Sequence, residues 1–309
     1  MRVAAIDVGT NSTRLLVAEE TAGGFRSIDR RMIITRLGQD VDRRRLLAPQ
    51  PLQRTLEVIA DYSAICGELG VDRLRITGTS AVRDARNREE FFAGVRALTG
   101  QDVELLSGER EASTTFLGAI SDLPGDEVTL VVDIGGGSTE LISGRREPER
   151  LVSLDIGCVR LYEKHLASDP PATDELEALR AEAGEALAGA KAELATAPGT
   201  RLVGVAGTVT QLAALQAGLP VYDPDVTHHA VLSHGDVRRL ARRLESLTYE
   251  QRKRIKGLVP GRADVIVAGA EILLQVMEIF DAAEVLVSEK DILDGLVIEV
   301  LSEPAAEKG

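Results

Sequence analysis

Two stretches of this chain share a pattern of residues that can bind phosphate and metal ions. In residues 5–15 and again in residues 131–141, an apolar run ends in aspartate, and glycine and a Ser-Thr pair precede a second apolar run. Glycine lets the backbone approach a ligand closely, and successive N–H groups in such a turn form a concavity that attracts anions. The pattern predicts two phosphate-binding turns, although a single copy is equally typical of a plain strand pair.

The two copies differ in charge, because Arg14 occupies the position that Glu140 occupies in the second copy. An arginine there can neutralise phosphate oxygens, and carboxylate oxygens are the ligands that Mg²⁺ prefers. We predict that Asp7, Asp133 and Glu140 bind Mg²⁺ or Mn²⁺. The predicted phosphate-binding residues of the two turns are Gly9, Thr10, Asn11, Ser12, Thr13, Arg14, Gly135, Gly136, Gly137, Ser138 and Thr139.

Each turn needs two strands to hold it, and short apolar runs bounded by glycine and small polar residues predict a β-hairpin at each copy. Strand and helix patterns alternate after each hairpin. The predicted strands are residues 31–37, 74–77, 103–106, 151–155, 202–206 and 285–288. The predicted helices include residues 52–69, 109–120 and 263–280, with a loop at residues 78–83. Helix capping boxes are predicted from the spacing of Asn87 with Glu90 and of Asp174 with Glu177.

This order of elements predicts an α/β fold with two domains, each a mixed sheet flanked by helices, and a cleft between the domains. The turn signal Pro124-Gly125-Asp126 stands just before the second repeat and separates domain 1–124 from domain 125–309. Packing of the last helix on the first domain is left open. The tail from residue 303 is expected to be frayed.

Composition excludes several classes of protein. The net charge is −13 and the chain has no tryptophan, which argues against a base-stacking surface for nucleic acid. The longest apolar runs are too short to span a bilayer, and the first residues do not resemble a secretory signal, so we expect a cytoplasmic protein without a membrane partner. Cys66 and Cys158 match no metal or redox spacing. Basic residues between 238 and 256 follow a helical pattern and indicate either an anion track or a solvated helix face.

Several motifs together resemble a known superfamily. Residues 7–14, residues 133–140 and the segment Val205-Ala206-Gly207-Thr208 resemble the phosphate motifs of actin, heat-shock chaperones and sugar kinases. Residues 79–85, 107–112, 222–224 and 260–264 narrow the resemblance to the exopolyphosphatase and guanosine pentaphosphate phosphohydrolase family. Longer members carry a further helical domain with a His-Asp metal site; this chain has no His-Asp dipeptide and resembles a short, two-domain member.

The resemblance implies two actin-like (ribonuclease H-like) domains and Mg²⁺-dependent, processive removal of the terminal phosphate of inorganic polyphosphate. It adds Gly207, Thr208 and Arg83 to the phosphate-binding residues. It also implies that Glu111, in the Ser-Gly-x-x-Glu-Ala motif, orients and deprotonates the attacking water. The neighbouring Glu109 is the alternative residue for that role. The alternative role for Glu111 is purely structural, as a carboxylate at a helix N-terminus that the helix dipole favours.

The sequence is also compatible with other activities. A relative of the same family hydrolyses guanosine pentaphosphate, and the guanosine alarmones could serve as substrate or inhibitor. A sugar or acetate-type kinase and a nucleotide-driven assembly protein share the fold class. Residues Ala206-Gly207 replace the usual glycine pair of the superfamily, and residues 288–295 depart from the family pattern, which weakens a nucleotide substrate. A monovalent cation and a homodimer are further expectations.

His228, His229 and His234 lack metal-ligand spacing and are interpreted as loop residues.

Overall fold

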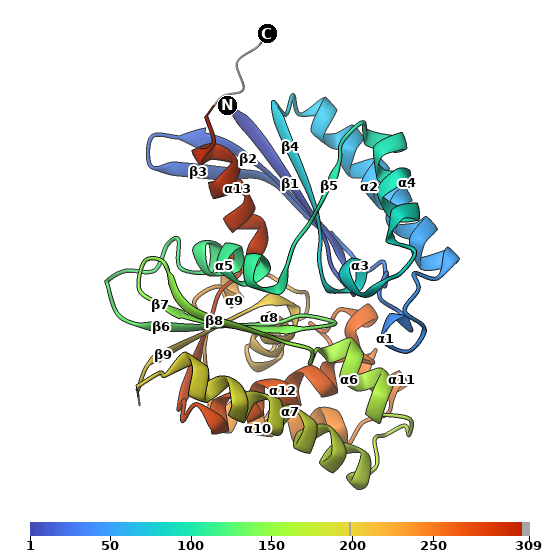
Figure 1. Ribbon diagram of the computed structural model, residues 1–309. Helices are drawn as coiled ribbons and strands as arrows, with labels where there is room; N and C mark the ends of the chain where they lie inside the picture. The colour runs from blue at the N-terminus through green and yellow to red at the C-terminus, as the bar shows by residue number, and fades with distance from the viewer. Residues whose placement is uncertain (198, 305–309) are drawn as a thin grey trace. The chain divides into compact units, whose positions relative to one another are not determined.

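The computed structural model describes residues 1–197 and 199–304. The chain forms two compact units: unit 1 contains Met1–Gly118 and the chain from Ile292 onward, and unit 2 contains Ala119–Asp291. Each unit has a mixed sheet with helices packed against it (Figure 1). In the described part of the chain, no helix is both long enough and apolar enough to cross a membrane.

The sheet of unit 1 has the strand order β3-β2-β1-β4-β5. Strands β1, β2 and β3 pair antiparallel, whereas β1, β4 and β5 run parallel. The strands are β1 (Arg2–Val8), β2 (Thr13–Thr21), β3 (Gly24–Ile33), β4 (Arg73–Gly78) and β5 (Val103–Leu105). The helices are α1 (Val41–Arg44), α2 (Pro49–Glu68), α3 (Ser80–Asp84), α4 (Arg88–Thr99), α5 (Gly108–Ala119) and α13 (Ile292–Ser302).

The sheet of unit 2 has the strand order β10-β11-β9-β6-β7-β8. Its strands are β6 (Thr129–Ile134), β7 (Thr139–Gly144), β8 (Pro148–Leu154), β9 (Arg201–Val205), β10 (Val231–Ser233) and β11 (Glu284–Val287). The helices are α6 (Cys158–His165), α7 (Thr173–Leu194), α8 (Ala206–Gln216), α9 (Pro224–Thr227), α10 (His234–Glu245), α11 (Tyr249–Arg252), the 3₁₀ helix η1 (Pro260–Arg262) and α12 (Ile266–Ile279).

The two sheets have the same topology. Strands β8-β7-β6-β9-β11 repeat the order and the directions of β3-β2-β1-β4-β5, and β10 adds an antiparallel edge strand in unit 2. In both units the first two strands form the hairpin that the repeated motif predicts. The structure therefore confirms the predicted fold class of two α/β domains with mixed sheets flanked by helices.

Strand β1 shows why the first strand of each sheet reads as a continuous apolar run. Ala4, Ile6 and Val8 face a core that includes Ile59, Tyr62 and Phe91 from α2 and α4. Val3 and Ala5 alternate with them and face a second core, which contains Leu296 and Val297 of α13. A central strand covered on both faces has no polar side, so its sequence does not alternate.

Helix α13 is fixed to unit 1 by both packing and charge. A Cβ on Gly295 would lie 1.9 Å from the carbonyl oxygen of Thr114, so α13 crosses α5 at a distance that only glycine permits. Glu299 accepts hydrogen bonds from Arg110 Nη2 at 2.7 Å and from the Thr114 hydroxyl at 2.9 Å, and it pairs with Arg75 Nη1 at 3.3 Å. The last helix thus completes the face of the first sheet.

Several local predictions are wrong, each for a physical reason. The predicted loop at residues 78–83 contains α3, because the chain turns into a helix directly after Thr79. The Asn87 side chain does not cap α4; it exchanges hydrogen bonds with the backbone of Leu47, at 2.8 and 3.1 Å. Asp174 lies inside α7, whose first turn is closed instead by Glu175, which accepts the N–H of Ala172 at 2.9 Å. The tail that we expect to be frayed stays a prediction, because residues 305–309 lie outside the described residues.

Candidate active site

The glycine turn of unit 1 joins β1 to β2 and is held from behind by a neighbouring loop. Gly9 N–H donates to the Ser12 carbonyl at 3.0 Å, which closes the turn. The carbonyls of Thr10 and Asn11 accept the N–H groups of Gly38 and Arg36, at 2.8 and 2.9 Å. In a planar trans peptide the N–H points opposite to the carbonyl. The N–H groups of Asn11 and Ser12 therefore point away from this loop and form a donor face.

The side chain of Asn11 adds an unpaired donor to this turn. Asn11 is buried, and within the described residues its Nδ2 has no hydrogen-bond partner. A buried amide N–H without a partner costs about 1–3 kcal/mol, so such groups usually mark a place where a ligand or water completes the bonding. Thr13 differs, because its buried hydroxyl lies 2.9 Å from that of Thr35 and joins β2 to the chain after β3.

The turn of unit 2 has the same construction with a different support. Gly135 N–H donates to the Ser138 carbonyl at 3.0 Å, as Gly9 does to Ser12. Here the first turn of α6 replaces the loop. The N–H of Cys158 donates to Gly135 O at 2.9 Å, the N–H of Val159 donates to Gly136 O at 2.9 Å, and Arg160 Nε donates to Gly137 O at 2.7 Å.

All three carbonyls of the second turn therefore point toward α6. By the same planar geometry, the N–H groups of Gly136, Gly137 and Ser138 point away from α6, on one side of the turn. Successive N–H groups with this orientation attract an anion. Thr139, like Thr13, uses its buried hydroxyl inside the protein, where it donates to Ile156 O at 2.6 Å.

In each hairpin one pair of polar side chains lies opposite each other near the turn, in the same register. Asp7 is directly opposite Arg14, and Asp133 is directly opposite Glu140. In unit 1 the pair is an ion pair: Arg14 Nη2 lies 2.7 Å from Asp7 Oδ2, and the Thr77 hydroxyl lies 3.3 Å from Asp7 Oδ1. In unit 2 the pair consists of two buried carboxylates, and the Ser153 hydroxyl orients Glu140 through a 2.8 Å hydrogen bond to Oε1.

Arg83 and Glu111 lie together in unit 1. Arg83 is on α3, directly after β4, and Glu111 is in the first turn of α5, after β5. Arg83 Nη1 lies 3.2 Å from Glu111 Oε2 and also donates to Leu106 O at 2.9 Å. The structure thus brings the predicted general base and a predicted phosphate-binding cation into contact, with the base paired to the cation.

The two candidate glutamates of α5 differ in environment. Glu111 is buried, whereas Glu109 is exposed. Hydrogen bonds from its own backbone N–H and from the Ser107 hydroxyl lower the pKa of Glu109, which makes it a weaker base. Glu109 therefore stabilises the start of its own helix, whereas Glu111 is paired with Arg83.

Gly207 and Thr208 lie in the first turn of α8, after β9. Ala206 stands at the strand–helix junction with φ of 66°, a left-handed conformation that favours glycine. A Cβ on Gly207 would lie 2.0 Å from Cζ of Arg262, so the guanidinium packs directly on this glycine at the positive end of the helix. Arg262 belongs to the 260–264 motif, but the sequence does not indicate its role, because its partner Gly207 is 55 positions away.

Sequence reasoning also missed the groups that support the two turns. Gly157 precedes α6, and a Cβ there would lie 2.4 Å from Gly136 O. A Cβ on Gly38 would lie 2.2 Å from Cγ2 of Thr10. Both glycines permit the close approach that puts their loops behind the turns. The glycines themselves are visible in the sequence, but their partners are not.

The fold and these turns define a class of protein. The chain contains a duplicated α/β domain with this strand order and with a glycine turn after the first strand of each copy, in agreement with the resemblance to actin, heat-shock chaperones and sugar kinases noted from the sequence. The chain belongs to the Ppx/GppA phosphatase family, whose model matches residues 16–303. The prediction of the family is thereby confirmed.

Individual relatives agree with this assignment. Exopolyphosphatase 2 of Mycobacterium tuberculosis is 39% identical over 313 residues, which cover 97% of this chain and 98% of that protein. Guanosine-5'-triphosphate,3'-diphosphate pyrophosphatase of Vibrio vulnificus is 28% identical over 301 residues, which cover 97% of this chain and 59% of that protein. A crystal structure of an exopolyphosphatase-like protein superposes with a TM-score of 0.93 at 34% identity, with 97% of each chain covered.

Proposed function

We propose that this protein removes the terminal phosphate from inorganic polyphosphate. The observation that carries the proposal is the first glycine turn: the backbone N–H groups of Asn11 and Ser12 point outward from it, and within the described residues Asn11 Nδ2 has no hydrogen-bond partner. Such a face suits the oxygens of a phosphate group. The 39% identity to a protein named exopolyphosphatase 2, over nearly its whole length, supports polyphosphate as the substrate.

The reaction requires positioned donors, charge neutralisation and an oriented water more than covalent chemistry by the protein. In our proposal the two turns bind phosphate oxygens through their outward N–H groups. Glu111 accepts the proton of the attacking water. Arg83 holds the Glu111 carboxylate at 3.2 Å before the substrate binds, and it can neutralise a phosphate oxygen once the chain is in place. Gly207 and Thr208 provide further N–H groups at the start of α8.

The register pairs suggest which residues would hold a divalent cation. In unit 1 the register pair is Asp7 with Arg14, whose guanidinium already supplies a positive charge to the aspartate. In unit 2 the pair is Asp133 with Glu140, an all-carboxylate donor set of the kind that Mg²⁺ prefers. We propose these two as the metal carboxylates; when bound, Mg²⁺ neutralises charge on phosphate oxygens. Asp7, whose oxygens contact Arg14 and Thr77, remains a predicted metal ligand, and a monovalent cation remains a prediction.

Hydrolysis of guanosine pentaphosphate is the second candidate function. The 28% identity to a guanosine-5'-triphosphate,3'-diphosphate pyrophosphatase over 97% of this chain favours it. This chain spans 59% of that relative's length, however, and the comparison therefore supports polyphosphate more strongly.

We further propose a cytoplasmic homodimer. Light scattering tests the dimer, since a mass that stays at one chain over a range of concentrations would exclude it.

Replacement of the two α5 glutamates tests the proposed mechanism. We expect Glu111→Gln to fold and to bind polyphosphate, but to lose activity by about 10²–10⁴-fold, the contribution typical of a general base. The matched control is Glu109→Gln, which we expect to retain activity because Glu109 is exposed. Phosphate release and polyphosphate binding are measured separately for both variants. Normal turnover by Glu111→Gln would remove Glu111 from the mechanism.

A further inference from the structure

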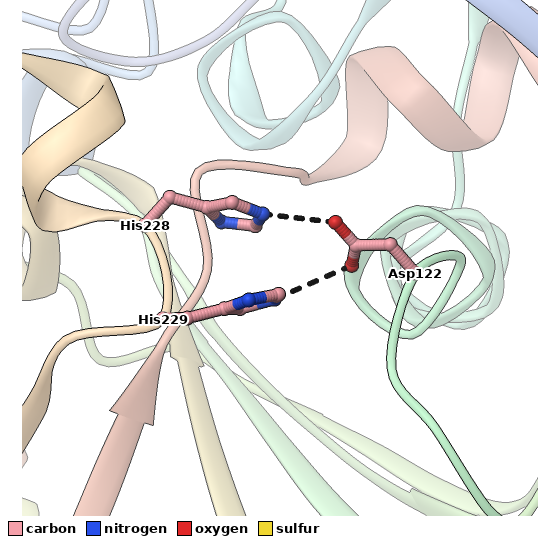
Figure 2. Close-up of side chains that lie close together, drawn as sticks. All are labelled: Asp122, His228 and His229. Carbon is pink, nitrogen blue, oxygen red and sulfur yellow. Dashed lines mark hydrogen bonds and ion pairs between the residues drawn. The ribbon is translucent and has the colours of Figure 1, made fainter.

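Unit 2 contains a cluster of three ionisable side chains, Asp122, His228 and His229 (Figure 2). His228 Nε2 lies 2.9 Å from Asp122 Oδ2, and His229 Nε2 lies 3.6 Å from Asp122 Oδ1. The two imidazole rings stack with their centroids 3.8 Å apart. Asp122 belongs to the segment that connects α5 to β6, and the histidines follow α9.

The hydrogen bonds of His228 determine where its proton lies. Its Nδ1 accepts the backbone N–H of Glu289 at 3.1 Å, so Nδ1 carries no hydrogen. Neutral imidazole has one N–H, which must then be at Nε2, where it donates to Asp122. A histidine that binds a metal usually donates its other N–H to an acceptor. In His228, by contrast, Nδ1 accepts a hydrogen bond from Glu289 N–H, and Nε2 donates to Asp122. The Lys290 ammonium also lies 3.2 Å from the Asp122 carboxylate. The cluster is therefore unsuited to a metal ion.

We propose that His228 is a proton-sensitive latch, which in its neutral form ties residues 288–291 to the α5–β6 connection. A protonated imidazole carries hydrogens on both nitrogens. The N–H at Nδ1 would then face the N–H of Glu289, and two donors cannot bond to each other. Protonation of His228 therefore breaks the bond to Glu289, while the contact with Asp122 can persist as an ion pair.

The charges around His228 act in opposite directions. Asp122 favours the protonated ring, because the carboxylate lies on its Nε2 side. The Glu289 N–H, the stacked ring of His229 and the ammonium of Lys290 all oppose it. Burial raises the pKa of Asp122, but the His228 and Lys290 hydrogen bonds outweigh it and lower the pKa overall. Asp122 therefore stays ionised throughout the range in which histidines titrate.

The latched segment carries further contacts that its release would affect. The carboxylate of Glu289 accepts hydrogen bonds from the Tyr222 and Thr227 hydroxyls. Residues 288–291 follow β11 directly, at the same edge of the sheet where β6 and β9 end in the glycine turn and the start of α8. Acidification is thus expected to loosen one of the three loops at the carboxyl edge of this sheet.

Hydrogen exchange at the Glu289 amide tests the latch in the full-length protein. Opening binds one proton, so we expect the protection factor of this amide, corrected for intrinsic exchange, to fall by up to about tenfold per pH unit between about pH 7.5 and about pH 5.5. His228→Gln should remove this dependence, because an amide side chain can donate and accept at every pH. The matched control is His234→Gln, whose histidine also faces a carboxylate, Glu278, at 3.4 Å; it should keep the wild-type dependence.

Nitrogen NMR of the His228 ring in the wild-type protein provides a second test that needs no variant. We expect the neutral ring to carry its hydrogen on Nε2. A hydrogen on Nδ1, a protection factor that does not change with pH, or an unchanged pH dependence in His228→Gln would each overturn the latch.

Discussion

The substitution Gly157→Ala tests whether close packing of α6 supports the second glycine turn. Gly157 has φ of −150° and ψ of 162°, an extended conformation open to any residue, so space alone requires glycine here. An added Cβ would lie 2.4 Å from Gly136 O and 2.5 Å from Gly136 C. Both atoms are backbone and cannot rotate away. The alanine must therefore push the turn and α6 apart, which weakens the bonds from Cys158 and Val159 N–H to the turn.

The expected magnitude follows from these contacts. Overpacking costs about 1–3 kcal/mol, and each net hydrogen bond contributes about 1 kcal/mol. We expect a loss of about 2–4 kcal/mol in the free energy of unfolding. We also expect KM for polyphosphate to rise about tenfold, since about 1.4 kcal/mol of lost binding corresponds to that factor.

Urea denaturation and steady-state phosphate release measure the two effects of Gly157→Ala. Gly189→Ala is the matched control, because Gly189 lies within α7 and a Cβ there meets nothing within 4 Å. That change should stabilise the protein by about 0.5–1 kcal/mol without affecting KM. Wild-type stability and KM in Gly157→Ala would refute the idea that α6 builds the turn by close approach.

Three further changes test other parts of the structure. Asn11→Asp replaces the unpaired donor by a carboxylate, so we expect KM for polyphosphate to rise about 10–100-fold in the same kinetic assay, with a small change in stability. Ala206→Gly relieves a φ of 66° and should stabilise the protein by about 1 kcal/mol in urea denaturation; a loss of stability would show that the junction is not strained. Burial and the neighbouring Glu271 raise the pKa of Glu245 to about 7 from 4.5. The folded state therefore binds this proton more tightly, and the free energy of unfolding should fall as pH rises from about 4.5 through about 7; Glu245→Gln should flatten that slope.

The repeated hairpin could be predicted because its determinants are local. Asp7 and Asp133 each follow an apolar run and stand one residue before the end of their strand, and the glycines come directly after the strand. The register then follows from the short turn, which places Asp7 opposite Arg14 and Asp133 opposite Glu140. Strand type, turn and pairing are all determined within about ten residues, where sequence patterns are most informative.

The supports behind the turns could not be predicted, because they are backbone contacts between distant segments. Gly38 N–H and Cys158 N–H bind turn carbonyls, but a backbone N–H leaves no signature in the sequence. The cap predicted at Asn87 failed for a related reason. Asn87 follows the local pattern of a cap, yet the backbone of Leu47, 40 residues earlier, takes its side chain.

The charged contacts between distant segments show the same limit. Arg83 and Glu111 each stand in a recognisable motif, but nothing in either motif indicates that the two side chains meet at 3.2 Å. The Glu289 N–H that donates to His228 Nδ1 is 61 positions from it in the sequence. Such pairs depend on which strands are neighbours in the sheet, and that order emerges only in the folded protein.

Phosphate release from long-chain polyphosphate tests the central claim most directly, measured beside release from guanosine pentaphosphate, each with Mg²⁺ and with EDTA. We expect release from polyphosphate that requires Mg²⁺ and exceeds release from the nucleotide. Preferential release from guanosine pentaphosphate, or release from polyphosphate that persists in EDTA, would contradict it.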